Sequence, residues 1–311
     1  MNYISIGSII KEYRKRAGLT QVQLCEGLCE PPTMNKIENG KQNPNKKLLD
    51  AIVQRLQIPL LLNVPATDSE IARDEIEKEI DDSISKYRYD IENLLEKYRK
   101  ISECMNKFEE QYYLLGHSIY LLHEKKDAEK SLLELDKAIR ITFPDYVYGC
   151  NIQEHIFTSI EFAILNSISI SYYHANKIDM AINLMQQLMI CLENRKFTLD
   201  IFSAKYPLVA YNLSLWLGIT KQYEKSLEIS QRGIDFCLKH EQYKIASDLF
   251  YNQGFTLICM GKQAAGTDFI KKSLAFDSIM QRTSSFSASL NDLETSFGKS
   301  FLSNVSVYSI L

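Results

Sequence analysis

The side chains best suited to chemistry in this sequence are short polar and cationic groups along one expected helix. The helix begins near Pro32, because proline is tolerated in a first helical turn, and it closes at Asn39-Gly40, where glycine supplies a left-handed conformation. Met34 and Ile37 take its buried side. A hydroxyl, an amide and an ammonium group on the other side can reach base edges and phosphates. The expected DNA contacts in this segment are Pro32, Thr33, Asn35, Lys36 and Lys41.

A shorter helix is expected just before this one. Thr20 and Gln23 have the spacing of a capping box, in which each satisfies a backbone group at the helix start. An apolar stripe at helical spacing follows and ends near Cys29; it consists of Val22, Leu24, Cys25 and Leu28. Gln21 lies at the positive end of this helix, where we expect it to donate to a DNA phosphate. Arg14, in the last turn of a helix over residues 6–17, is a second candidate for phosphate contact.

The two helices together resemble a known DNA-binding unit. The pattern TQxQL followed by xxTMxKIENGKxxP is similar to the helix-turn-helix of lambdoid phage repressors and their bacterial relatives. The resemblance implies a head of five short helices over about 65 residues. Pro31-Pro32 departs from the polar pair that relatives carry there. Because a proline side chain offers a base edge at most a contact with a thymine methyl, base recognition would then rest on Thr33, Asn35 and Lys36.

Asparagines recur later in the chain at a fixed offset. Tyr211-Asn212 and Tyr251-Asn252 lie 40 residues apart, and Asn166 falls near the corresponding place one repeat earlier. An amide side chain offers a donor and an acceptor, so a row of asparagines could hold an extended peptide by its backbone. The alternative is that these asparagines cap or bridge helices. The candidate peptide contacts on these helices are Asn166, Tyr173, Tyr211, Asn212, Leu215, Trp216, Tyr251, Asn252 and Phe255.

Spacings of 50, 45 and 40 residues, the last equal to the asparagine offset, mark a repeated helical pair from about residue 105 onward. Four segments align, at 125–132, 177–184, 221–228 and 261–268, each with a small residue at the same place and an aromatic residue before it. The small residues are Ser131, Ala181, Ser226 and Gly266, and the aromatic ones are Tyr120, Tyr172, Trp216 and Phe255. Small residues let helices pack closely, so we predict a degenerate tetratricopeptide-like solenoid. The fold class is all-α.

Between head and solenoid lies a highly charged stretch, residues 65–104, expected to form a linker helix that holds the head off the body. Residues 1–62 carry nine Lys/Arg and five Asp/Glu, a net +4, whereas residues 67–110 carry eight and 14, a net −6. A basic head suits DNA, because contacts with phosphates provide most sequence-independent affinity. The predicted domains are 1–64, 65–104 and 105–311.

The sequence contains no motif that is typical of an enzyme active site. Seven scattered cysteines form no CxxC pair, five dispersed histidines form no HExxH, and no nucleophile, phosphate loop or acid–base carboxylate pair can be placed. We therefore expect no catalytic residue, no metal and no cofactor. The N-terminus lacks the features of a signal peptide, and no apolar run is long enough to span a membrane, so the expected location is the cytoplasm.

The whole chain also resembles the peptide-pheromone receptors of Gram-positive bacteria, the Rgg–Rap–NprR–PlcR–PrgX group, most of all the PlcR branch. The likeness includes LQIP after the head, QYY at 111–113, and AYNLSLWLG with YEKSL in the body. It implies that Asn166 and Asn212 bind the backbone of a short re-imported peptide; Asn252 is added by internal repetition alone. It further implies basic contacts for acidic groups of the peptide, for which Lys97 and Arg99 are the candidates.

The combined expectation is a homodimeric, DNA-binding transcription regulator of quorum-sensing type, switched by a short signalling peptide. Its partners would be double-stranded operator DNA and that peptide, with no membrane. One alternative is a phage- or plasmid-type repressor whose body only dimerises or binds a partner protein. Another is a Rap-like phosphatase or protein inhibitor, against which the intact motif at 19–44 argues.

Overall fold

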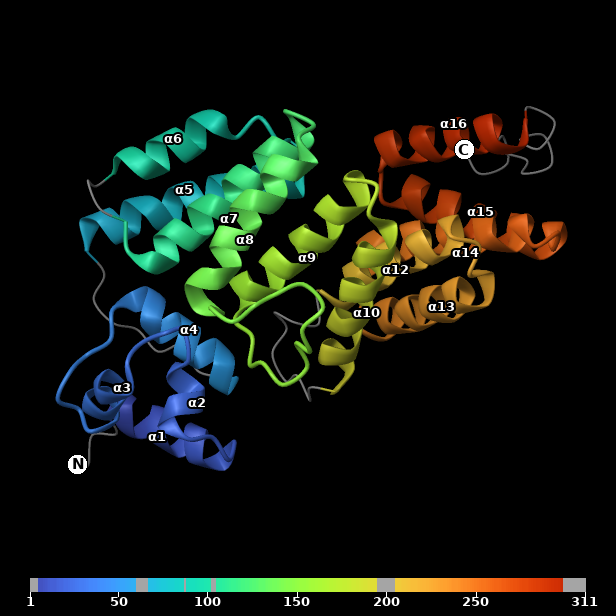
Figure 1. Cartoon of the computed structure of the whole chain (residues 1–311). Helices are drawn as coiled ribbons and strands as arrows, with labels where there is room; N and C mark the ends of the chain where they lie inside the picture. The colour runs from blue at the N-terminus through green and yellow to red at the C-terminus, as the bar shows by residue number, and fades with distance from the viewer. Residues whose placement is uncertain (1–4, 60–66, 87, 102–104, 195–204, 299–311) are drawn as a thin grey trace. The chain divides into compact units, whose positions relative to one another are not determined.

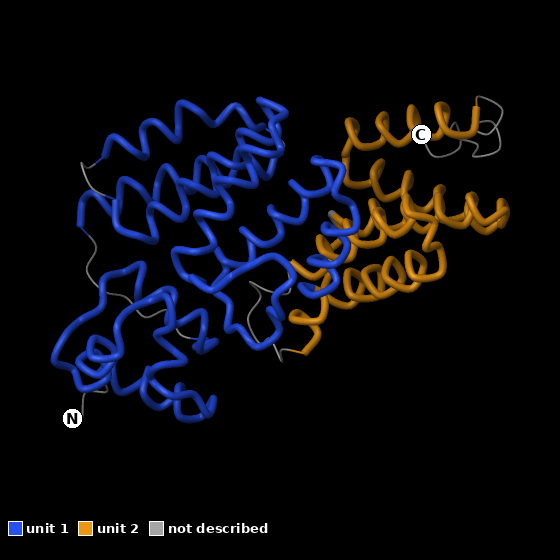
Figure 2. The backbone as a smooth tube through the Cα atoms, in the orientation of Figure 1, with its two compact units in different colours: residues 1–188 blue, residues 189–311 orange. Residues whose placement is uncertain are grey.

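The structure is a computed structural model that describes residues 5–59, 67–86, 88–101, 105–194 and 205–298. In these residues every regular element is an α-helix, as predicted (Figure 1). The chain divides into two compact units, residues 1–188 and 189–311, shown in Figure 2. The boundary falls inside α10 (Ile178–Asn194).

Four helices form the head: α1 (Ile6–Arg16), α2 (Gln21–Cys25), α3 (Pro31–Glu38) and α4 (Lys46–Leu56). The side chains of Ser5, Thr20 and Asn45 accept from backbone N–H groups at the starts of α1, α2 and α4, and Thr20 and Gln23 form the predicted capping box. Ile10, Leu24, Met34, Ile37 and Ile52 pack in one buried core. The sequence predicts five short helices over about 65 residues; four lie in the described part of this domain, and residues 60–66 lie outside the described residues.

One detail of α2 differs from the prediction. The helix ends at Cys25 rather than near Cys29, and Val22 is exposed rather than part of the apolar face. Because α2 has only five residues, Leu24 and Cys25 are sufficient to anchor it, together with Leu28 in the turn that follows.

The charged stretch expected as one linker helix folds as two helices. These are α5 (Asp68–Ser85) and α6 (Glu92–Lys100), and Ile80, Ile91 and Leu95 pack with Tyr120 of α7 (Lys107–His123) in one core cluster. Arg73 of α5, over the Tyr98 ring, pairs with Glu109 of α7 in a buried ion pair with a nitrogen–oxygen distance of 2.6 Å. The segment is therefore packed against the helical repeats instead of serving as a spacer.

The rest of the first unit consists of α7, α8 (Ala128–Thr142), α9 (Ser159–His174) and most of α10. Capping boxes start α7 and α9; the one at α9 pairs Thr158 with Glu161. The second unit contains α12 (Tyr206–Ile219), α13 (Tyr223–Lys239), α14 (Tyr243–Cys259), α15 (Gln263–Ile279) and α16 (Thr283–Phe297).

The repeat predicted from the sequence is present in the turns between paired helices. Lys126, Asn176, Lys221 and Gly261 each have a positive φ, between 55° and 79°, and follow one another at intervals of 50, 45 and 40 residues. These are the intervals that separate the small residues Ser131, Ala181, Ser226 and Gly266 in the sequence. The repeat is therefore one of backbone conformation as well as of residue type.

The small residues of the repeat lie where helices meet. Ser131, Ala181, Ser226 and Gly266 are all buried. A Cβ on Gly266 would lie 2.7 Å from the carbonyl oxygen of Gly254, so only glycine allows α14 and α15 to approach this closely. The described cysteines are free thiols. Cys104 lies outside the described residues.

Candidate functional site

The candidate DNA-reading surface is the outer face of α3. Met34 and Ile37 are buried in the head core, while Pro32, Asn35 and Lys36 are exposed and Thr33 is half-buried. The side-chain amide of Asn39 donates to both the backbone oxygen and the Oδ1 of Asn35, at 2.9 and 3.1 Å. This leaves the NH₂ group of Asn35 available for a base acceptor. Lys41 is also exposed, just beyond the helix.

Arg14 and Gln21 are held by a buried carboxylate, that of Glu38 at the end of α3. Arg14 donates to both oxygens of Glu38, at 2.5 and 3.1 Å, and to the carbonyl of Leu19 at 2.7 Å. Gln21 donates to Glu38 Oε2 at 2.7 Å. Burial alone would raise the pKa of Glu38, but the hydrogen bonds from Arg14 and Gln21 and the charge of Arg14 outweigh it and lower that pKa. Glu38 thus joins the last turn of α1 and the first residue of α2 to α3. Phosphate contact by Arg14 and Gln21 stays a prediction.

Several cations of the head face the helical body rather than solvent. Lys46 and Lys47 of α4 pair with Asp74 of α5, and Lys47 also reaches Glu77 at 2.7 Å. Arg55, at the other end of α4, pairs with Glu161 of α9. Among the described head residues, the exposed lysines that form no ion pair are Lys15, Lys36 and Lys41. The net positive charge of the head therefore overstates the charge it can offer to DNA.

The candidate peptide-binding asparagines are of two kinds. Asn166 of α9 and Asn212 of α12 are each only 9 % exposed, and each has a buried amide atom without a hydrogen-bond partner. That atom is the oxygen Oδ1 in Asn166 and the nitrogen Nδ2 in Asn212. A buried polar atom left unpaired costs about 1–3 kcal/mol, so each of these atoms calls for an explanation.

Asn252 differs from these two. Its Nδ2 donates to the backbone oxygen of Tyr211 and to Ser214 Oγ, both at 3.1 Å, and so ties α14 to α12. This is the bridging role that the sequence left open as the alternative for these asparagines. A peptide contact by Asn252 stays a prediction, and its donors are already occupied.

The remaining peptide candidates vary in accessibility. Tyr173, Tyr211, Leu215, Tyr251 and Phe255 are half-buried, and Trp216 is buried. The Tyr251 hydroxyl donates to Asp292 of α16 at 2.5 Å. On α6, Lys97 and Arg99 are exposed while Leu95 and Tyr98 are buried, so both cations point away from the packed face of that helix.

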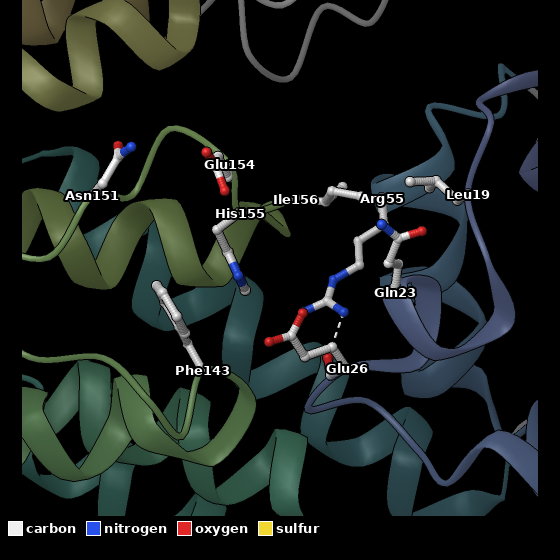
Figure 3. Close-up of a pocket in the computed structure, with 9 residues that line it drawn as sticks. All are labelled: Leu19, Gln23, Glu26, Arg55, Phe143, Asn151, Glu154, His155 and Ile156. Carbon is white, nitrogen blue, oxygen red and sulfur yellow. Dashed lines mark hydrogen bonds between the residues drawn. The ribbon is translucent and has the colours of Figure 1, made fainter.

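A cavity that the sequence does not reveal lies between the head and the helical body of the first unit (Figure 3). Its volume is about 320 Å³. Leu19, Gln23, Glu26 and Arg55 line it from the head, and Phe143, Asn151, Glu154, His155 and Ile156 line it from the body. Beside the cavity lies the Thr158–Glu161 capping box, whose spacing in the sequence predicts the start of a helix. Its ionic partner Arg55, 106 residues earlier, has no local signal.

In the described part of the chain, no three or more His, Cys, Asp and Glu side chains gather as metal ligands would. None of the described helices combines the length and the hydropathy needed to cross a membrane.

Comparison with known proteins gives two family matches and several similar folds. Residues 150–288 match the RNPP family C-terminal domain, and residues 10–62 match a helix-turn-helix family. No protein with a curated description matches the chain.

The similar structures include PlcR of Bacillus thuringiensis in complex with the peptide PapR7 and DNA, with a TM-score of 0.59, 24% identity, and coverage of 93% of this chain and 100% of that one. PlcR in its apo form has a TM-score of 0.58 and 22% identity, covering 92% and 98%. ComR of S. thermophilus, in complex with DNA and its signalling peptide ComS, has a TM-score of 0.51 and 14% identity, covering 93% and 98%.

The fold is thus shared with these proteins over nearly the whole chain. The helix-turn-helix head and the matched C-terminal domain occur here in the same order as the sequence predicted. Its C-terminal part is therefore similar to the RNPP family C-terminal domain, and its N-terminal part to helix-turn-helix domains.

Proposed function

We propose that this protein is a cytosolic, homodimeric transcription regulator that binds operator DNA through α3 and is switched by a short peptide. It has no catalytic role. The observation that carries the proposed peptide contacts is that Asn166 of the first unit and Asn212 of the second each hold a buried amide atom with no hydrogen-bond partner. The oxygen of Asn166 can accept from a peptide N–H, and the nitrogen of Asn212 can donate to a peptide carbonyl. PlcR and ComR, the similar proteins, were each determined with a peptide and DNA.

The peptide site is tested by comparing Asn212→Ala with Asn252→Ala. Asn212→Ala should abolish the response to peptide and change the free energy of unfolding little, because its Nδ2 makes no bond within the chain. Asn252→Ala should lower the free energy of unfolding by about 1–3 kcal/mol, because it removes two hydrogen bonds that tie α14 to α12. Trp216, one helical turn from Asn212, provides the fluorescence signal, and urea denaturation provides the stability.

The titration uses peptide fractions of host culture medium and short synthetic peptides. A saturable change in Trp216 fluorescence that disappears in Asn212→Ala supports the proposal. If wild-type protein binds DNA but gives no change with any fraction, the protein is a repressor whose body serves only to dimerise. Unaltered peptide affinity in Asn212→Ala would assign that asparagine a purely structural role.

The DNA site is tested on α3. Lys36→Ala should weaken binding to all duplexes alike, because an ammonium group contacts phosphates. Asn35→Ala should weaken binding by about 1–3 kcal/mol and relax the preference for a base, because its amide faces outward and reads base edges. Fluorescence anisotropy against operator duplexes and randomised duplexes measures both effects. Wild-type affinity in both variants would show that α3 is not the recognition helix.

A further inference from the structure

The head is fastened to the helical body through α4. At the start of α4, Lys47 pairs with Asp74 and Glu77 of α5, at 3.1 and 2.7 Å. At its end, Gln54 Oε1 accepts from the backbone N–H of Ser159, the first residue of α9, at 2.8 Å. Arg55, the next residue, reaches Glu161 of the same helix. The DNA-binding domain is thus docked against α5 and α9 rather than tethered by a linker alone.

Arg55 belongs to the head and to the body at once. Its NH1 donates to the backbone oxygens of Leu24 and Glu26 in the head, at 3.1 and 2.5 Å. Its NH2 donates to Glu161 Oε1 at 3.1 Å, and the two side chains are 1 % and 0 % exposed. Its Nε is buried without a partner, beside the cavity (Figure 3). The guanidinium therefore joins the turn after α2 to the first turn of α9.

Glu161 is fixed from the body side as well. It accepts from the backbone N–H of Thr158 at 2.6 Å and from its hydroxyl at 2.9 Å, as the third residue of a capping box. His155 Nε2 lies 3.3 Å from the Oε1 that Arg55 contacts, and its ring stacks on Phe143 with centroids 4.0 Å apart. Glu161 therefore moves only if the first turn of α9 moves with it.

The backbones meet closely at this junction. The glycine Gly27, in the turn between α2 and α3, has no Cβ, and one built there would lie 1.9 Å from the carbonyl oxygen of Thr142 at the end of α8. Lys107 Nζ at the start of α7 donates to the carbonyl of Gly27 at 2.7 Å. The turn that precedes the recognition helix thus rests directly on the helical body.

α9 also carries Asn166. It lies five positions after Glu161, which is about 7.5 Å along the helix axis and about 140° around it. The two side chains therefore leave the helix on different sides, one toward the head and one toward the proposed peptide. Separating the partners of a buried ion pair leaves each charge without compensation, so a partly opened contact is costly.

We propose that Glu161 is a positioning residue that couples peptide occupancy on α9 to the placement of the DNA-binding head, through its ion pair with Arg55. This inference rests on the proposed function, because it takes the peptide and DNA as the two ligands. A displacement of α9 when Asn166 engages a peptide is carried to Arg55 and the turn before α3. The state of this contact then shifts the balance between a head that is held against the body and one that is released, together with the contacts of Lys47, Gln54 and Gly27.

Glu161→Gln tests the coupling, because glutamine still fits the capping box but presents an NH₂ group to Arg55. Glu70→Gln is the matched control: Glu70 holds the same place in the capping box of α5, and its carboxylate accepts from the backbone N–H and hydroxyl of Thr67. The double variant Arg55→Met/Glu161→Gln removes both buried charges and guards against misfolding of the single variant.

The probes are a duplex and a short peptide, each selected from random-sequence pools on the wild-type full chain. The readout is the ratio of duplex dissociation constants without and with peptide, a coupling that we expect in the range of roughly 5- to 150-fold in the wild type. The ratio should survive in Glu70→Gln and fall to within about twofold of one in both Glu161 variants, with peptide affinity retained. A wild-type ratio in either Glu161 variant, or a wild-type ratio of one with both ligands binding, would overturn the proposal.

Hydrogen exchange of the unliganded chain separates this proposal from the function on which it rests. Amides of α4 and of the first turn of α9 should exchange at least about tenfold faster in Glu161→Gln than in wild type or Glu70→Gln. If no peptide binds, the proposed function fails, and faster exchange still identifies Glu161 as the residue that holds the head. If a peptide binds but exchange and coupling are unchanged, only the role of Glu161 fails.

Discussion

At the scale of single residues, buried ionisable groups of the first unit gather where helices distant in sequence meet. Glu38 joins three helices of the head, and Glu161 joins the head to the body. Burial alone would raise the pKa of Glu161, but the hydrogen bond with His155, the charges of Arg55 and His155, and the backbone N–H of Thr158 outweigh it and lower the pKa to about 2. Each carboxylate is therefore stabilised in its charged form by its partners.

This lowered pKa predicts an acid-sensitive component of stability. The pKa of Glu161 is about 2 in the folded chain against 4.5 ordinarily, so its contribution is complete above about pH 4.5 and is lost as the pH falls toward 2. The whole contribution is on the order of 3 kcal/mol. Urea denaturation at about pH 6 and about pH 3 should therefore show a smaller loss of stability in Glu161→Gln than in wild type. Equal losses would mean that Glu161 titrates normally.

At the scale of elements, many helix boundaries and turns can be predicted from the sequence, because residues close together in the chain determine them. The capping box at Thr20, the prolines that open α3 and the glycine after it place the helix-turn-helix to within a few residues. The turn residues of the repeats follow the sequence offsets. The break between α5 and α6 was not predicted, because no glycine or proline marks it and the packing of Leu95 and Tyr98 decides it.

Contacts between elements were the part that the sequence could not supply. In the sequence, Lys46 and Lys47 contribute to the net positive charge of the head. Only in the fold do Asp74 and Glu77 lie close enough to pair with them. The amide repeat shows the same limit: Asn212 and Asn252 occupy equivalent places in sequence, yet Ser214 and the carbonyl of Tyr211 satisfy only Asn252. Partners of this kind depend on distances between helices, which residue types alone do not determine.

The close approach at Gly27 yields a prediction at this scale. Gly27→Ala should destabilise the chain by roughly 2–5 kcal/mol, because a Cβ would meet Thr142 and the residue has a φ of +66°. Gly18→Ala is the matched control, since Gly18 has a φ of +71° and open space around it, and it should cost only about 1–2 kcal/mol. Urea denaturation measures both. Equal costs would mean that the turn after α2 is not pressed against α8.

At the scale of the whole molecule, charge is divided between holding the head in place and meeting DNA. Lys46, Lys47 and Arg55 are committed to the body, Arg14 to Glu38, and Arg16 to Glu12 of its own helix, so the exposed lysines Lys15, Lys36 and Lys41 remain for phosphates. For two heads this gives about six contacts. We therefore expect the logarithm of the DNA association constant to fall with the logarithm of salt concentration with a slope no steeper than about −5.

Fluorescence anisotropy between about 50 and about 200 mM salt measures this slope. Lys41→Ala should make it shallower by about 2 for two heads. Lys46→Ala is the control, because this lysine pairs with Asp74, and the slope should stay as in wild type. A much steeper wild-type slope, or a shallower one in Lys46→Ala, would show that α4 separates from α5 when the head binds DNA.

The buried serines between helices limit how the repeats can deform. Ser131 Oγ lies 3.0 Å from Ser171 Oγ, Ser226 Oγ donates to the carbonyl of Ser214 at 2.7 Å, and Ser247 Oγ to Asp277 at 2.6 Å. A serine side chain is too short to follow a partner that moves away. A shift of one residue along a helix is about 1.5 Å, which is enough to break such a hydrogen bond. These hydrogen bonds therefore permit small rotations of paired helices but oppose sliding of one helix along the other. Bending within each unit is then expected to proceed by small rotations that add up from one helix to the next.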